Sequence, residues 1–565
     1  MSGTSWRSLL CVSALFCAPT AWAEVIGDPE DPSVRALPDT EGVTEDPTDN
    51  ESGANDGWIG DPEAPPMVPI PTPASEPTPQ TSPADTESSF VPQARFRGNA
   101  LSQSQLDLRR QGSDEDTFEL LHEASLGLRV RFSPRWSAVV EGRLSWWLTS
   151  GYAGVDSPLI TDPSDWQGRV EPMLRDAYVT GRAGEWQFRL GQVPVSWGST
   201  DFSRPADVVA PRDLRRGPFA GREEARIPVP AIDATWLHDR IAWQFLVIPF
   251  FVPNQQPLYG SDYALARQGS PVADTLPLGL IDQAIDASIE DRTNPALTQT
   301  ELPEELLRNT QLGTRFTSSY GGMDVSASWY WGYDRNPWVY ISPSVREFAR
   351  VLGEQPADGP LISLNADTLA VAGPLIDDIN AGKTLIESSY RRYQVFALDG
   401  VRYVGPVGVR FETAFSPVRT GYLAGLTTVR RPQLTTAVGL SYEGESTVVL
   451  SLEGFYAHTF AQEGDGDWLL ETDRQWGTAA AVQWDLASVS RTGSAWNNAS
   501  LQVASLFFPN GQDLFVFPAA VWEFERGLKV EAGVALFSSF DDDKATVGDV
   551  VDWNDSAWLR VSHVF

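Results

Sequence analysis

The residues best suited to polar chemistry gather in one proline-rich segment, residues 199–226. Pro205, Pro211 and Pro218 stiffen it, because each proline fixes its own φ angle. Planar guanidinium groups bind carboxylates through two parallel hydrogen bonds. We therefore expect its charges to pair with one another, with a surrounding wall or with a passing solute. The candidate residues here and just before it are Arg189, Trp197, Asp201, Arg204, Asp207, Arg212, Asp213, Arg215 and Arg216.

The elements that must position this segment alternate apolar and polar side chains with a period of two, from about residue 95 onward. Between Trp136 and Leu148, every second residue is apolar or glycine. The intervening residues are mixed and include Glu141 and Arg143, which we add to the candidates that would line a lumen. The pattern predicts β-strands with one apolar face and one polar face.

Short and long connections alternate between the predicted strands. Connections at 133–135 and 183–185 are short, whereas those at 254–309, 338–388 and 420–430 are long. This alternation is typical of antiparallel transmembrane β-barrels, with short turns at one end and long loops at the other. We predict an all-β barrel over residues 94–565 with about 18 strands, 16 being the alternative. The predicted strands begin near residues 95, 118, 136, 167, 186, 227, 241, 310, 324, 389, 408, 431, 447, 474, 499, 513, 528 and 556.

Aromatic residues close to strand ends, such as Trp146-Trp147 and Trp329-Tyr330-Trp331, favour a barrel in a lipid bilayer. A soluble sandwich or propeller fits less well, because its strands rarely expose a full apolar face and no blade-length repeat is present. Two stretches within the long loops, 278–289 and 345–352, have the apolar spacing of amphipathic helices.

One strand and the loop after it resemble a family of uncharacterised Gram-negative outer-membrane barrels. The family pattern is a strand that ends in W-G-x-x-D, followed by a P-x-D…P-x-D-L loop. Here it is matched by Trp197-Gly198-Ser199-Thr200-Asp201, Pro205-Ala206-Asp207 and Pro211-Arg212-Asp213-Leu214. Leu174–Val179 is similar to the neighbouring strand of the same hairpin. The resemblance covers about residues 170–216 and implies a porin-like barrel with no particular solute.

The last strand, Trp558–Phe565, also resembles the C-terminal signature of Gram-negative outer-membrane proteins. In those proteins the barrel-insertion machinery recognises a terminal strand that ends in phenylalanine. The resemblance therefore implies that machinery as a partner. His563 departs from the apolar residue usual at its position.

The N-terminus predicts export. Arg7, an apolar run over residues 9–16 and Ala21-Trp22-Ala23 have the order of a secretory signal peptide, residues 1–23. Cleavage there would remove Cys11 and Cys17, the two cysteines of the chain. Residues 24–93 hold 14 Pro, 16 Asp+Glu and one basic residue, Arg35, a composition typical of a disordered tether.

The tether contains one repeated motif. Ile26-Gly27-Asp28-Pro29-Glu30 recurs as Ile59-Gly60-Asp61-Pro62-Glu63, which follows Trp58. One interpretation is a docking motif for a periplasmic partner, with Trp58, Ile59, Asp61 and Pro62 as its candidate residues. The other is duplicated low-complexity sequence without a partner.

Several classes of function are disfavoured. With 42 Lys+Arg against 75 Asp+Glu, the net charge of -33 would repel nucleic acid. We expect no cofactor and no metal, although the acidic runs 463–467 and 541–543 hold oxygen ligands that calcium prefers. No G-x-S-x-G elbow is present. The remaining route to a hydrolase is an outward histidine beside a serine on an adjacent strand, so we expect no enzyme.

The sequence therefore predicts a porin-like outer-membrane channel whose lumen is narrowed by the 199–226 loop. Within it, the loop charges either line the passage or form a structural latch against the wall, and one set of residues can do both. The alternative is the outer-membrane component of an export or lipid-transport system, docked through a periplasmic tether.

Overall fold

The computed structural model describes most of the chain from residue 92 onward. The described ranges are 92–108, 118–150, 167–215, 217, 222–255, 298–303, 308–353, 366–423, 427–443, 447–469, 473–486, 498–540, 546–551 and 554–565. The signal peptide, nearly all of the tether with Trp58, Ile59, Asp61 and Pro62, the stretch 278–289 and Arg216 lie outside them.

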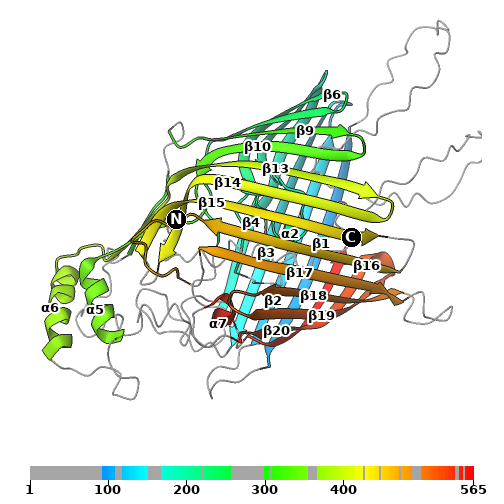
Figure 1. The fold of residues 1–565 in the computed structure, drawn as a ribbon. Coiled ribbons are helices and arrows are strands. Elements are labelled where there is room, and N and C mark those ends of the chain that lie inside the picture. The colour runs from blue at the N-terminus through cyan, green and yellow to red at the C-terminus, as the bar shows by residue number, and fades with distance from the viewer. Residues whose placement is uncertain are drawn as a thin grey trace, which may run out of the picture.

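Eighteen strands form one closed antiparallel barrel (Figure 1). Each strand pairs with the next along the chain, and β21 pairs back with β1. The barrel strands are β1 (Gln93–Asp107), β2 (Phe118–Arg131), β3 (Trp136–Ser150), β4 (Gln167–Ala183), β5 (Trp186–Val193), β6 (Val229–His238), β7 (Ile241–Ile248), β9 (Gln311–Tyr320), β10 (Met323–Tyr333), β13 (Arg392–Val404), β14 (Val407–Leu423), β15 (Thr427–Glu443), β16 (Val448–Thr459), β17 (Arg474–Asp485), β18 (Ala499–Phe508), β19 (Asp513–Phe524), β20 (Leu528–Ser538) and β21 (Ser556–Val564).

The predicted strand number is confirmed, and the 16-strand alternative is wrong. The largest error in a strand start is at β15, which was placed near residue 431 and begins at Thr427. One predicted long loop, 420–430, is also wrong, because β14 continues to Leu423 before β15 begins. The alternation of connections is thus less strict than predicted: 424–426 is short at the loop end, and 486–498 is long at the turn end.

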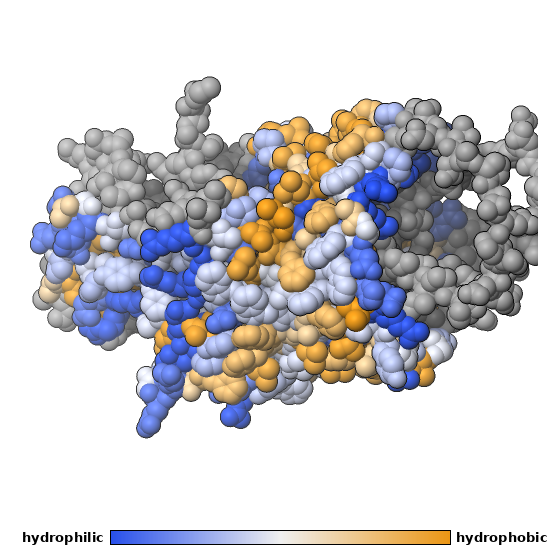
Figure 2. Space-filling view, turned by 90° about the horizontal axis from the view of Figure 1, so that it is seen from above, coloured by the Kyte–Doolittle hydropathy of each residue, from blue (hydrophilic) through white to orange (hydrophobic). Residues whose placement is uncertain are grey.

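Period-2 alternation places apolar side chains on the outside of the barrel. On β3, Trp136, Val140 and Leu144 are 40–50% exposed, whereas Arg143 and Ser145 between them are buried on the inner face. Figure 2 shows hydrophobic side chains gathered over the strands, with hydrophilic ones toward the ends. Among the described helices, none is both long enough and apolar enough to cross a membrane.

A small second unit extends from the loop end (Figure 1). Strands β11 (Trp338–Ile341), β12 (Ile386–Ser389) and β8 (Thr298–Glu301) form a three-stranded sheet. Helices α5 (Pro343–Gly353) and α6 (Ala366–Asn380) pack together beside it, and α5 confirms the predicted helix over 345–352. The shorter helices are α2 (Arg222–Ala225), η7 (Glu525–Gly527) and α7 (Val547–Val551).

Candidate functional site

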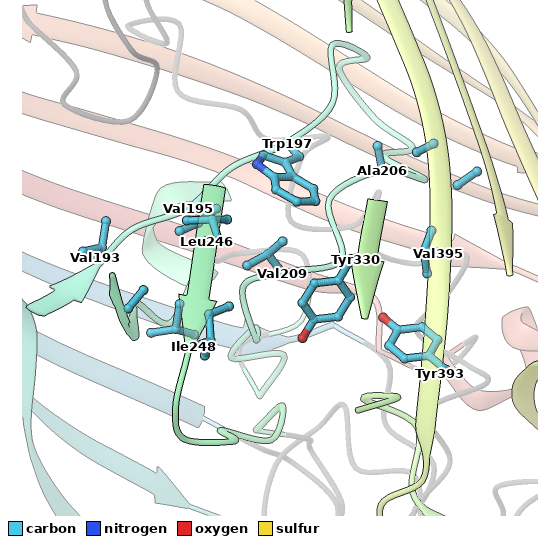
Figure 3. Close-up of a cluster of buried hydrophobic side chains, with 14 of the residues drawn as sticks. Val193, Val195, Trp197, Ala206, Val209, Leu246, Ile248, Tyr330, Tyr393 and Val395 are labelled. Atoms are coloured by element: carbon cyan, nitrogen blue, oxygen red, sulfur yellow. The ribbon is translucent and has the colours of Figure 1, made fainter. Parts of the chain in front are cut away.

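The connection between β5 and β6, residues 194–228, folds into the barrel; we call it the crossing segment. Its apolar side chains are almost completely buried, with Trp197 1% and Val209 0% exposed. Figure 3 shows these two side chains between Leu246 on β7 and Val395 on β13. The segment therefore shares an apolar core with the inner wall from β3 to β14. The core comprises Val139, Tyr178, Val193, Val195, Trp197, Ala206, Val209, Val229, Ala231, Leu246, Ile248, Tyr330, Tyr393, Val395, Ala397 and Ala414.

Glu412 on β14 holds the far end of the crossing segment. Its carboxylate is fully buried and accepts hydrogen bonds from the backbone N–H groups of Ser199 (3.0 Å), Thr200 (3.3 Å) and Ala206. The Thr200 hydroxyl donates at 2.8 Å to Oε2, the oxygen that the N–H groups of Ser199 and Thr200 also reach. One side chain on the wall thus satisfies several backbone donors that the loop buries.

Glu453 on β16 repeats this arrangement two strands further round the barrel. It is 1% exposed and accepts from the backbone N–H groups of Asp201 (3.0 Å), Phe202 (3.1 Å) and Ser203 (2.6 Å). The side chain of Asp201 in turn accepts from Arg410 on β14 at 2.9 Å and from Ser451 at 3.1 Å. Asp201 is therefore a partner of the wall.

These contacts mean that the segment spans the lumen. Going round the barrel from β5, the strands β6, β7, β9, β10 and β13 come before β14. A loop that leaves β5 and bonds to β14 and β16 must cross the interior. On its way back, Arg212 and Arg226 both reach Asp207, at 3.0 and 3.4 Å.

Asp207 is the centre of a charge cluster inside the segment. Besides the two arginines, it accepts a hydrogen bond from the backbone N–H of Trp197 at 3.3 Å. Burial alone would raise the pKa of Asp207, but the positive charges of Arg226 and Arg212 hold that pKa below its usual value. The carboxylate therefore stays ionised and ties both ends of the segment together.

A second group of charges fixes the return path to strands near β5. Arg215 makes a two-pronged pair with Glu171 on β4, at 2.8 Å for both contacts, and also bonds Asp213 at 2.7 Å. Arg143 on β3 donates to the backbone carbonyl of Glu224 at 3.2 Å and lies 3.6 Å from Glu123 on β2. The segment is thus bonded to the wall on both sides of the lumen.

A polar chain anchors the root of the segment. The Trp197 indole N–H donates to Gln244 on β7 at 3.0 Å, and Gln244 donates to Asp233 on β6 at 3.1 Å. Arg189 on β5 pairs with Asp233 at 2.7 Å. Arg204 donates to the Thr200 carbonyl at 2.7 Å and so closes the turn around Glu412.

Gly198 is required by its surroundings. Its φ is +96°, a conformation that side chains with a Cβ rarely adopt. A Cβ there would also lie 2.6 Å from a carboxylate oxygen of Glu412. The glycine of the W-G-x-x-D pattern thus lets the backbone approach the buried glutamate, while Trp197 and Asp201 on either side bond to the wall.

The structure therefore brings together eight of the candidates: Arg189, Trp197, Asp201, Arg204, Asp207, Arg212, Asp213 and Arg215. Arg143 joins them, whereas Glu141 lies nearer the turn end, opposite Asp176 on β4. Sequence reasoning missed Glu412, Glu453, Asp233 and Glu171 as partners of the crossing segment. The sequence feature that could have pointed to them is a carboxylate at an inward position of a strand with alternating side chains.

The four histidines pack against aromatic rings. Ring centroids lie 5.4 Å apart for His122 and Trp146, and 4.3 Å apart for His458 and Phe460. His238 and His563 stack on Trp236 and Phe565. Ser102 is the cross-strand partner of His122, but the outward neighbours of that histidine on β2 are Leu120 and Ala124, which offer no polar group to orient it.

The described residues contain no group of three metal-ligating side chains close enough to hold an ion. In the first acidic run, Asp465 forms an ion pair with Arg431, which lowers the pKa of the aspartate. The run 541–543 lies outside the described residues.

No known protein-family profile and no curated protein matches this sequence. Among solved structures, OccK8 (OprE) of Pseudomonas aeruginosa is 9% identical, with 84% of this chain and 98% of that chain covered and a TM-score of 0.44. OccAB1 of Acinetobacter baumannii is 8% identical, with 84% of this chain and 96% of that chain covered and a TM-score of 0.43. OmpF of Salmonella typhi, solved with daunomycin, is 8% identical, with 84% of this chain and 97% of that chain covered and a TM-score of 0.35. These values describe a distant likeness in overall architecture.

Proposed function

We propose that the chain is a porin-like channel of the Gram-negative outer membrane, which passes a solute by passive or facilitated diffusion. The predicted signal peptide, the apolar outer belt and the terminal Phe565 support this location. With an even number of strands, both ends of the barrel lie at the turn end, which we assign to the periplasm. The proposed partners are the bilayer and the barrel-insertion machinery.

The observation that carries the proposal is the bridge across the lumen. A segment bonded to β14 and β16 at one end and to β3 and β4 at the other would act as a fixed constriction. Latch and constriction are then the same set of contacts. Selection would act by size and by charge, without any bond made or broken.

The bridge also favours one side of the lumen for the proposed passage. The crossing segment packs against the wall from β3 to β14, so a solute would pass on the other side, along β17–β21, β1 and β2. That wall is polar at mid-height, where Arg560 donates to Gln103 at 3.1 Å and lies 3.8 Å from Glu531. Toward the loop end it becomes aromatic, with Phe515 and Phe537 centroids 5.4 Å apart.

Single-channel conductance of the mature chain in planar bilayers tests both statements. The mature chain is expected to have no cysteine, so S125C on β2 and S328C on β10 would each carry a unique thiol on the inner face. A charged thiol reagent should reduce the conductance of S125C and leave that of S328C unchanged. Absence of conductance in every variant would refute the channel. Block through S328C alone would show that the solute passes on the side of β10, which contradicts the proposed path along β17–β21, β1 and β2.

A further inference from the structure

Four arginines gather on the inner face of β1 and β2 at the turn end; we call Arg95, Arg97, Arg129 and Arg131 the mouth arginines. The β1–β2 register sets Arg95 opposite Arg129, and Arg97 opposite Gly127. Arg95 and Arg97 share a face with buried Leu101 and Gln103, because alternate residues of a strand point the same way. By the same rule, Arg129 and Arg131 share a face with buried Leu121.

These positive charges lie at an accessible edge. Arg95, Arg97 and Arg131 are exposed, and Arg129 is half-buried. The pairing of β21 with β1 starts at Asn99, and Phe565 bonds to Gly98, so residues 93–97 extend past the last strand. On that side they have no neighbouring strand among the residues that the structure describes.

Negative charge is scarce in the same part of the wall. In the turn-end half of β1 to β4, the described inward positions carry five arginines, the four mouth arginines and Arg182, against two carboxylates, Glu141 and Asp176 opposite it. Like charges directly across a strand pair repel each other, so an additional anion at this edge would lower the repulsion. The mouth therefore favours a ligand with several carboxylates.

The chain itself supplies such a ligand next to this surface. Residues 24–93 carry a net charge of -15, and 13 of their 16 carboxylates lie in residues 24–63. The strand that bears Arg95 and Arg97 begins at Gln93, so the acidic stretch is attached at the mouth. The spacer, residues 64–92, can extend to roughly 90 Å at about 3.1 Å per residue and averages about 30 Å as a coil.

We propose that the acidic segment 24–63 docks on the mouth arginines through carboxylate–guanidinium pairs. Such a short spacer gives the segment a high effective concentration at the mouth, so pairs that are individually weak act together. The contact is electrostatic and solvent-exposed, so salt should release it: the Debye length falls from about 10 Å at 0.1 M to about 3 Å at 1 M. This inference goes beyond the proposed function and holds whether or not a solute passes.

Distance measurement between two nitroxide labels tests the docking in the full mature chain. One label replaces Asn55 in the acidic segment, and the other replaces Ala183, which is exposed at the end of β4. We expect a population of short label-to-label distances at low salt that disappears near 1 M NaCl. A distance distribution that salt does not change would overturn the proposal.

Two matched double variants identify the surface. R95Q/R97Q removes two exposed arginines of the mouth, whereas R240Q/R402Q removes two exposed arginines at the same end of the barrel on other strands. The short distances should vanish in the first variant and persist in the second. If both variants behave alike, or if inorganic phosphate binds the mouth while the segment stays distant, the arginines serve another anion and the docking is refuted.

Discussion

The two sides of the lumen are held in different ways. On the side from β3 to β14, the crossing segment buries an apolar core and is bonded at both ends through carboxylates. On the side from β17 to β2, the wall at mid-height is made of polar side chains that bond one another, such as Arg560 and Gln103. One barrel thus combines an apolar packed interior on one side with a wall of polar side chains and aromatic rings on the other.

The largest effect is expected from removing both anchors. In E412A/E453A, at least six backbone N–H groups of the segment lose their acceptor, at a cost of about 1–3 kcal/mol for each buried donor. The segment should leave the wall while the barrel remains. Limited proteolysis should then cut near residue 202, and single-channel conductance should rise.

E412Q/E453Q is the matched control, because each amide keeps one oxygen acceptor. It should be cut more slowly than the alanine variant. Equal resistance of the wild type and E412A/E453A to protease would show that the carboxylates are not the anchors.

A single added methyl group should have the next largest effect. G198A would place a Cβ against Glu412 in an unfavourable conformation, and we expect a loss of about 2–4 kcal/mol in thermal or denaturant unfolding. G184A is the control, since Gly184 also has positive φ but nothing lies within 4 Å of its added Cβ. If G184A destabilises as much as G198A, backbone strain alone explains the loss.

The Asp207 cluster should make the attachment of the crossing segment to the wall sensitive to acid. Because the pKa of Asp207 is lowered in the fold, its contribution is complete above the unfolded-state pKa of about 3.9 and is lost as pH falls through the folded value. Protease resistance of the segment should therefore decline as pH falls from about 5 to about 2. D207N should flatten this part of the profile, and an unchanged profile would contradict the assignment.

The smallest effect is expected on the opposite wall. Q103A removes two hydrogen bonds from Arg560, at 3.1 and 2.9 Å, and should cost about 1–2 kcal/mol in unfolding. Protease resistance of the crossing segment should not change, because its anchors Glu412, Glu453 and Glu171 lie on other strands. Faster cleavage near residue 202 in Q103A would mean that the two sides are coupled.

Local patterns were enough to predict the barrel but not the bridge. Strand number and strand positions follow from alternation and turns, which act over a few residues. The anchors could not be found this way, since Glu412 and Ser199 are 213 residues apart and a carboxylate on an inward face has many possible partners. The error at 420–430 has a physical source: β14 and β15 continue beyond the apolar belt, where alternation no longer marks a strand.

The position of the anchors also constrains the order of assembly. The crossing segment follows the fifth barrel strand, but the side chains that hold it belong to the eleventh and thirteenth, more than 200 residues later. Contacts so distant in sequence form slowly. The segment therefore stays undocked, with its backbone donors hydrated, until most of the barrel strands have paired. Its docking is a late folding step, and a barrel with strands but no bridge is the intermediate that this topology requires.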